Sequence, residues 1–288
     1  MNFYHRSIMI LMIVSITIFS FHASFGEKKD QEKLTGILKK SGEYCKKLEN
    51  AALDFVCKEK IIEKIDVSDE WAGRDRVLRI VKDLPGAWKP SKKIKENTFM
   101  YDYQLIKKNK EVKETRILLE ENGKKKYEKN SEIKTEMFYF EKSLFGPIGL
   151  LSEYWQDYHH YKIIGEEILD AEKVIIIEAI PKSSLELRHL YGKIWAKESD
   201  FSILKIEWEP ESMKNYEIIK KVAEKYKATP KITLISEYKV EKNGIRFPSK
   251  VFIYEAYISK RGKFIKSETT IIYEDYKFFT VEIEIKYK

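Results

Sequence analysis

Alternation of apolar and polar residues dominates this chain, and it is clearest between residues 232 and 257. The segment reads ITLISEYKVEKNGIRFPSKVFIYEAY, with an Asn-Gly pair at 243–244. An Asn-Gly pair tolerates the positive φ angles of a two-residue turn, so it is a strong hairpin signal. Such a turn sets Val240 opposite Phe247 and Leu234 opposite Ile253. Because a one-residue slip would turn every side chain over, this agreement predicts a long antiparallel hairpin.

One face of this hairpin is apolar, whereas the other is charged near the turn. The apolar face carries Leu234, Tyr238, Val240, Phe247, Val251 and Ile253. Further strand patterns occur at 52–65, 99–107, 113–120, 133–140, 160–168, 173–180, 191–197, 201–208, 264–273 and 279–287. Sheets of this size tend to curl or close. We therefore predict a mainly β fold: a large curled antiparallel sheet, an incomplete β-barrel of about eleven strands with covering α-helices.

Three stretches change from strand periodicity to helical periodicity. Residues 31–49, about 147–157 and 212–226 each place their apolar residues on one side of a helix. In the second helix, Leu151, Trp155 and Tyr158 share a face. Such a stripe is ordinary core in most proteins, and it could alternatively form a lid over an apolar cavity. Residues 66–96 show no clear pattern, and we expect a surface excursion there.

The first 26 residues differ from the rest of the chain. Arg6 precedes an apolar run over residues 7–21, and small residues follow up to Gly26. This order is typical of a secretory signal peptide cleaved near Gly26. An uncleaved membrane anchor is the alternative, but the run is short for a membrane span. We expect one domain over 27–288, located in the periplasm without stable membrane insertion.

The charge distribution and the cysteine content limit the possible binding partners and predict a covalent link. The formal net charge is +8, but acidic and basic residues alternate, and this argues against a nucleic-acid-binding surface. The only two cysteines are Cys45, on the apolar side of the first helix, and Cys57, on the apolar side of the first strand. An even number of cysteines in an oxidising compartment predicts a disulfide between them.

The sequence offers no positive case for catalysis. His159 and His160 are adjacent on a predicted strand, so they point to opposite faces and cannot share a metal, and His189 is isolated. Glu178 follows an apolar run but can simply face solvent. Motifs for a nucleophilic serine, a helical zinc site or a phosphate-binding loop are missing. We expect no enzyme activity, no metal and no cofactor.

Two segments resemble a known superfamily. YGKIWAKESDFSILKIEWEP resembles the central hairpin of the outer-membrane lipoprotein carrier (LolA/LolB-like) superfamily. KNGIRFPSKVFIYEAY, followed by IIYEDYKFF, looks like the C-terminal strands of that superfamily's bacterial lipoprotein-sorting relatives. The resemblance covers roughly residues 30–288 as a pattern, but residues 66–96 have no counterpart in it, and the cysteine pair is not a general feature of the superfamily. It implies an incomplete barrel with a helical lid around an apolar cavity.

The resemblance also implies a function. Members carry lipids or lipid-modified proteins across an aqueous compartment, with envelope donor and acceptor proteins as candidate partners. An alternative is a non-catalytic structural or assembly factor of the cell envelope, with a filled interior. Because only short helices can cover many apolar strand faces, we expect a cavity. Its predicted lining is Leu151, Trp155, Tyr158, Leu204, Ile206, Leu234, Tyr238, Val240, Phe247, Val251, Ile253, Val281, Ile283 and Ile285.

Overall fold

The computed structural model describes residues 31–50, 54–67, 93–108, 111–140, 145–182, 189–259 and 262–279. The predicted signal peptide, most of the excursion predicted at 66–96, and Val281, Ile283 and Ile285 lie outside these residues.

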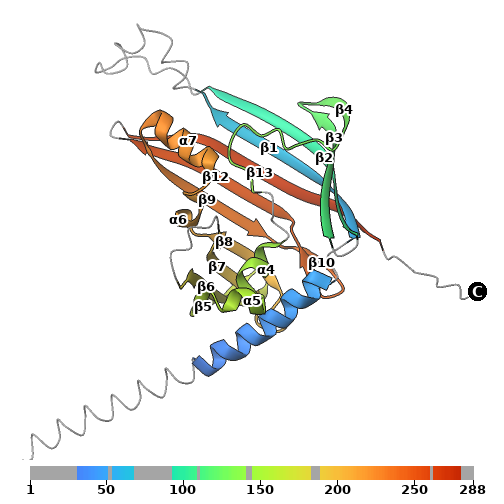
Figure 1. Cartoon of the computed structure of the whole chain (residues 1–288), viewed down its shortest axis with the longest axis vertical. Coiled ribbons are helices and arrows are strands. Elements are labelled where there is room, and N and C mark those ends of the chain that lie inside the picture. Colours follow the sequence, from blue (N-terminus) through green and yellow to red (C-terminus); the bar gives the residue numbers. More distant parts are fainter. Residues whose placement is uncertain are drawn as a thin grey trace, which may run out of the picture.

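The described chain is built on one large antiparallel sheet (Figure 1). Eleven strands follow the order β4-β3-β2-β1-β13-β12-β9-β8-β7-β6-β5, and β10-β11 form a separate two-stranded sheet. The sheet is curled but not closed, so the predicted fold class is confirmed. The strands are β1 (Asp54–Asp66), β2 (Ile94–Lys108), β3 (Glu111–Glu121), β4 (Lys124–Lys129), β5 (His159–Leu169), β6 (Glu172–Pro181), β7 (Gly192–Lys197), β8 (Ile203–Trp208), β9 (Thr229–Glu237), β10 (Val240–Lys242), β11 (Ile245–Phe247), β12 (Lys250–Ser259) and β13 (Gly262–Phe278).

The predicted register of the 232–257 hairpin is confirmed. Val240 pairs with Phe247 in β10-β11, and Leu234 pairs with Ile253 in β9-β12. The hairpin is nevertheless interrupted between these two ladders. The N–H of Tyr238 donates to the carbonyl oxygen of Leu204, which continues the β8-β9 pairing one residue past the end of β9.

Some strand predictions need correction. Strand β2 begins at Ile94, inside the predicted excursion, and β13 continues through Phe278. The predicted strand at 133–140 is wrong, since residues 131–140 have no regular secondary structure. Strand β4 was not predicted; the turn at 122–123, with positive φ at both residues, folds its exposed residues back against β3.

The helices are shorter than predicted, except the first. Residues 31–50 form one helix, hereafter the N-terminal helix. The helix predicted at 147–157 is broken at Ser152, whose ψ is 151°, into α4 (Gly146–Leu151) and α5 (Glu153–Gln156). The helix predicted at 212–226 is likewise divided into α6 (Pro210–Met213) and α7 (Glu217–Tyr226).

The helices cover one side of the sheet, which we call the inner face (Figure 1). Helix α4 packs on β8, α5 on β5, and α6 and α7 on β9. The main hydrophobic core lies on this face and includes Phe55, Ile177 and Ile194. A small second cluster of Val174, Trp195 and Leu204 lies on the opposite, outer face.

Candidate functional site

Most of the predicted cavity residues lie together on the inner face. Leu151, Ile206, Leu234, Tyr238, Phe247, Val251 and Ile253 belong to the main core, and Val240 packs against it partly buried. Leu234, Val251 and Ile253 are 0% exposed. No space large enough for a water molecule adjoins these three side chains. Their role in ligand binding therefore stays a prediction, and the inner face is filled around them.

The predicted position of Leu204 is wrong, because this residue does not lie on the inner face with Ile206. The β7-β8 register shifts between Trp195 and Ala196, and Leu204 is the extra residue opposite this irregularity. An extra residue of this kind reverses the alternation of the strand. Leu204 therefore packs against Val174 and Trp195 on the outer face.

Trp155 and Tyr158 are turned away from the centre of the inner face. The break at Ser152 ends the helical stripe that would align them with Leu151. The ring of Trp155 stacks on that of His189, with centroids 4.3 Å apart. Tyr158 is 41% exposed. These two side chains border the start of β5 and do not close over β9 and β12.

Helix α4 lies unusually close to the sheet. A Cβ atom on Gly146 would be 2.7 Å from the hydroxyl oxygen of Tyr238 and 2.9 Å from Cζ2 of Trp208. Only glycine lets the helix backbone approach these rings so closely. By contrast, a Cβ on Gly149, in the same helix, would meet nothing within 4 Å. The hydroxyl of Tyr161 also donates to the carbonyl oxygen of Leu150.

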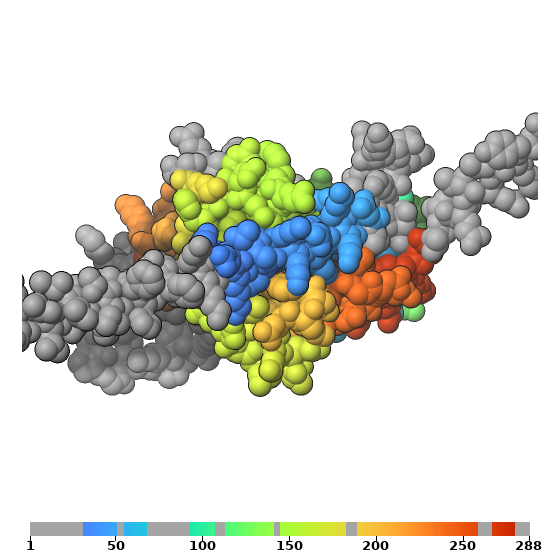
Figure 2. All heavy atoms as spheres, turned by 90° about the horizontal axis from the view of Figure 1, so that it is seen from below, coloured from blue at the N-terminus to red at the C-terminus, as the bar shows by residue number. Residues whose placement is uncertain are grey.

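The N-terminal helix adds a further layer of cover. Its buried side chains include Ile37, Tyr44 and Leu48. The hydroxyl oxygen of Tyr44 accepts the backbone N–H of Arg246 at 3.1 Å, and burial raises the pKa of Tyr44 to about 12. In Figure 2 this helix, in blue, crosses the surface with the α4-α5 region along one side.

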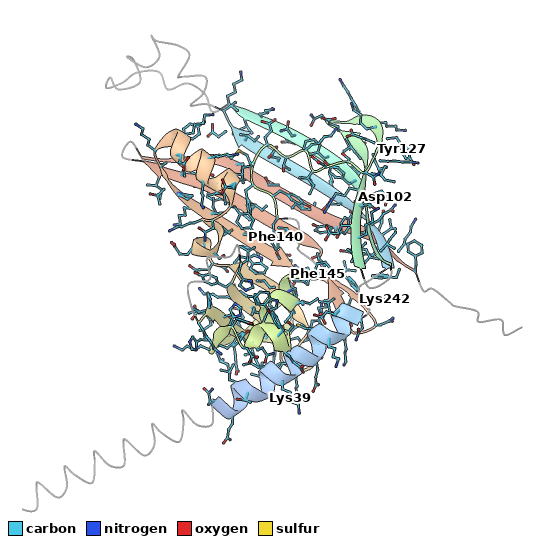
Figure 3. The ribbon with its side chains drawn as sticks, viewed as in Figure 1. Lys39, Asp102, Tyr127, Phe140, Phe145 and Lys242 are labelled. Atoms are coloured by element: carbon cyan, nitrogen blue, oxygen red, sulfur yellow. The ribbon has the colours of Figure 1, made fainter. Side chains whose placement is uncertain are left out.

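Residues 131–140 cross the other half of the inner face. Phe138 and Phe140 are buried in the main core, and the ring of Phe140 packs edge-to-face on Trp208 at 5.4 Å. Figure 3 shows Phe140 near the middle of the molecule. This segment thus covers the sheet without joining it.

Glutamates hold this segment to the sheet. Glu59 and Glu63 in β1 and Glu255 in β12 are each at most 1% exposed. Glu63 accepts the backbone N–H groups of Glu136 and Met137, both at 2.9 Å. These contacts use the backbone groups that a strand would have paired, so they explain why 133–140 is not a strand.

The charge of Glu59 is matched by a buried arginine. Nε of Arg116 lies 2.6 Å from Oε2 of Glu59, and the Tyr139 hydroxyl donates to Oε1 at 2.6 Å. The guanidinium also lies over the ring of Tyr103, 4.6 Å from its centroid. A buried ion pair offsets its desolvation only with such additional bonds.

Glu255 has fewer partners. Ser267 donates to its Oε2 at 3.0 Å, and the backbone of Phe138 also hydrogen-bonds to this carboxyl group, while Oε1 has no partner in the described part of the chain. Burial raises the pKa of Glu255 to about 7, against the effect of these two hydrogen bonds. Sequence reasoning missed all three glutamates. For Glu59 and Glu63 a signal existed, since they share the alternation phase of Phe55 and Ile61.

The histidines are arranged differently from the prediction. His159 is buried and His160 exposed, so their opposite orientation is confirmed. The prediction that His189 is isolated is wrong, because its Nε2 lies 3.0 Å from Nε2 of His159. Across the described ranges, no group of three or more His, Cys, Asp or Glu side chains is placed to hold a metal.

The predicted disulfide is a further correction, since Cys45 and Cys57 are both free thiols in the core. Cys45 points toward α4, where its thiol donates to the carbonyl oxygen of Pro147 at 3.5 Å. Cys57 instead hydrogen-bonds to Tyr276. Burial raises the pKa of both thiols well above the ordinary value, so neither is an activated nucleophile.

A shallow pocket of about 270 Å³ lies at the β5-β6 hairpin. It is lined by Glu166, Glu167, Ile168, Lys173, Val174 and Glu198. This lining is too polar for an acyl chain, so the pocket is a poor candidate for the predicted cavity. Within the described residues, no helix has the length and apolar character needed to cross a membrane.

The fold and the covered face define a class: an open, curled antiparallel sheet with a helical cover on one side. No family model and no curated protein matches the chain. Among solved structures, it is similar to a LolA superfamily protein from Nitrosomonas europaea, with 12% identity, 86% of this chain and 94% of that chain covered, and a TM-score of 0.34. It is also similar to an outer membrane lipoprotein-sorting protein domain from Vibrio parahaemolyticus, with 13% identity, 86% and 94% coverage and a TM-score of 0.35.

A third similar structure is a DUF1329 family protein from Desulfovibrio piger, with 10% identity, 88% of this chain and 94% of that chain covered, and a TM-score of 0.36. The first two bear the names of the superfamily, and of the sorting relatives, that the sequence pattern resembles.

Proposed function

We propose that this chain is a periplasmic carrier or binding protein that shelters the acyl chains of a lipid or an acylated lipoprotein on the inner face of its sheet. The observation that carries the proposal is the nature of the cover. A broad apolar face is covered by helices and an irregular segment instead of a second large sheet. In water, an acyl chain costs about 0.8 kcal/mol per exposed CH₂ group, so such a face can bind it without covalent chemistry.

In this proposal the structure is the closed, empty form, and the cover moves to admit the ligand. Helix α4 has six residues and α5 has four, and neither has a side-chain N-cap hydrogen bond. Helices this short depend on their packing and not on their own stability. Movement at the Ser152 break would uncover Trp208 and Tyr238, which α4 contacts through Gly146. Elements that open are generally those of low local stability.

The proposal includes a route and a compartment. The signal peptide at 1–26 would direct the chain to the periplasm, where residues 27–288 would act as one domain. The lipid would pass between envelope donor and acceptor proteins. The absence of enzyme activity is part of the same proposal, since carriage requires no bond to change.

A pair of glycine variants tests the proposal. Gly146→Val places atoms against Tyr238 and Trp208 and should push α4 off the sheet, whereas Gly149→Val in the same helix has open space. We expect a fluorescent fatty acid to bind the wild-type chain, and Gly146→Val to change its Kd at least fivefold relative to Gly149→Val. Mass spectrometry should also find lipid in the protein purified from the envelope. No probe binding by any of the three proteins would reject the carrier function.

The packed interior favours a second candidate, an envelope structural or assembly factor. Leu234, Val251 and Ile253 have no accessible surface, as expected for a filled core. Under this alternative, Gly146→Val would lower stability without creating any lipid binding, and no lipid would co-purify.

A further inference from the structure

The contact between His159 and His189 has no part in the proposed carrier function. His159 is the first residue of β5, and His189 lies just before β7. Their Nε2 atoms are 3.0 Å apart, and the ring of His189 is stacked on Trp155 of α5. Three parts of the chain therefore meet around one pair of imidazole nitrogens.

The proton positions on His159 follow from its neighbours. Its Nδ1 lies 2.8 Å from the backbone carbonyl oxygen of Trp155. A carbonyl oxygen can only accept, so Nδ1 carries the proton. In the neutral ring, the lone pair of Nε2 then points at His189. Burial lowers the pKa of His159 against the effect of the Trp155 hydrogen bond, with Lys182 also lowering it, while burial and the neighbouring His159 lower the pKa of His189 to about 4.

A neutral imidazole whose Nδ1–H is held by a carbonyl is the usual arrangement of a metal-binding histidine. Zinc–nitrogen bonds are about 2.0–2.1 Å long, so two ligands at a tetrahedral zinc are about 3.3 Å apart. The observed separation is 3.0 Å. A shift of a few tenths of an ångström, within reach of the half-buried His189, would admit an ion between the two nitrogens.

We propose that His159 and His189 form a two-imidazole site for a divalent transition metal ion of the Zn²⁺ type. On binding, the Nε2 proton of His189 passes through solvent to its own Nδ1, so both Nε2 lone pairs face the ion. Water takes the remaining positions, because the described residues supply no third ligand. Two imidazoles are half of the four protein ligands of a structural zinc site, so binding is weaker than at such a site. The ion would join α5, β5 and the start of β7.

Calorimetric titration of the full chain with Zn²⁺ at pH 7.5 tests this site. His160 provides a matched control, since it is exposed and lies on the other face of the same strand. We expect His189→Gln to weaken one Zn²⁺ site at least tenfold, and His160→Gln to leave that site unchanged. His5 and His22 remain in every variant, so they cannot cause the difference. Equal Zn²⁺ binding by the two variants, or no binding at all, would overturn the proposal.

A measurement on the unaltered chain removes any doubt from misfolding. Long-range ¹⁵N NMR spectra report each imidazole nitrogen separately. Zinc should shift the Nε2 signals of His159 and His189 together and leave Nδ1 of His159 protonated. A shift confined to His160, or to neither nitrogen of the pair, would contradict the two-imidazole site.

Discussion

The two halves of the inner face are covered by different physical means. Over β8, α4 is held by the close packing of a glycine on two aromatic rings and by neutral hydrogen bonds from Tyr161 and Cys45 to its carbonyl oxygens. Over β1 and β12, residues 131–140 are held by buried carboxylates that accept backbone N–H groups. Apolar packing has little directionality and neutral hydrogen bonds are weaker than hydrogen bonds to charged groups, so the buried carboxylates fix one arrangement more firmly. The comparison therefore assigns the movable cover to the α4 half and the fixed cover to the 131–140 half.

The largest expected effect is a loss of stability when the fixed cover over β1 and β12 is disrupted. Arg116→Met leaves Glu59 buried without its cation, which costs about 3–5 kcal/mol of unfolding free energy. Urea denaturation would measure this loss. Glu96→Gln, which removes the exposed pair with Lys64, is the control and should give no resolvable change. Similar midpoints for the two variants would mean that the buried network does not hold this half.

The next effect concerns pH. The pKa of Glu255 is raised from 4.5 to about 7 in the folded state, so the folded chain binds more protons than the unfolded chain between these values. Stability is therefore highest below pH 4.5 for this group and falls as pH rises to about 7, by on the order of 3 kcal/mol. Glu255→Gln should remove this fall in denaturation curves recorded from pH 4.5 to 8.

For His189, the dependence of stability on pH has the opposite sign. The pKa of His189 is lowered from 6.5 to about 4, so its contribution is present above pH 6.5 and is lost as pH falls toward 4. His189→Gln should flatten the acid limb of the stability profile, while Glu255→Gln should flatten the neutral limb. A profile altered on the same limb by both variants would contradict this division.

A smaller effect is expected in the movable half. Gly146→Ala forces a Cβ against Tyr238 and Trp208, at a cost of about 1–3 kcal/mol. Gly149→Ala has open space and should stabilise α4 by about 0.5–1 kcal/mol, as alanine does in helices. Thermal denaturation of the two variants would show opposite shifts in Tm. Equal shifts would mean that α4 does not lie so close to the rings.

The smallest effect is expected at the surface. Lys33 of the N-terminal helix pairs with Glu166 of β5, and both side chains are about half exposed. Exposed pairs of this kind are screened by water and salt. Lys33→Ala should leave the urea midpoint unchanged, at low or high salt. A clear loss would show that this pair anchors the helix.

Local patterns were sufficient to predict most of the sheet. The Asn243-Gly244 turn fixed the register from Leu234 to Ile253 because its geometry depends on two residues only. Leu204 could not be placed in the same way, since the irregularity that reverses it depends on how β7 aligns with β8.

The polar contacts of the site could not be predicted from local patterns either, because they join residues that are far apart in the sequence. Glu59 meets Arg116, 57 residues away, and His189 meets His159 across 30 residues. The sequence next to each of these residues does not indicate which distant residue it contacts. The alternation at 133–140 even pointed to a strand, because it could not reveal that Glu63 takes up the backbone N–H groups.

The exposed, lysine-rich strand β4 affects whether two copies of the molecule can pair edge to edge. An open sheet leaves its outermost strand with backbone groups that another chain could pair with, which is the usual route to aggregation. Four of the six residues of β4 are lysines, and all six are exposed. Two copies that approached along this edge would bring their positive charges together. The repulsion disfavours pairing of β4 with the β4 strand of a second copy.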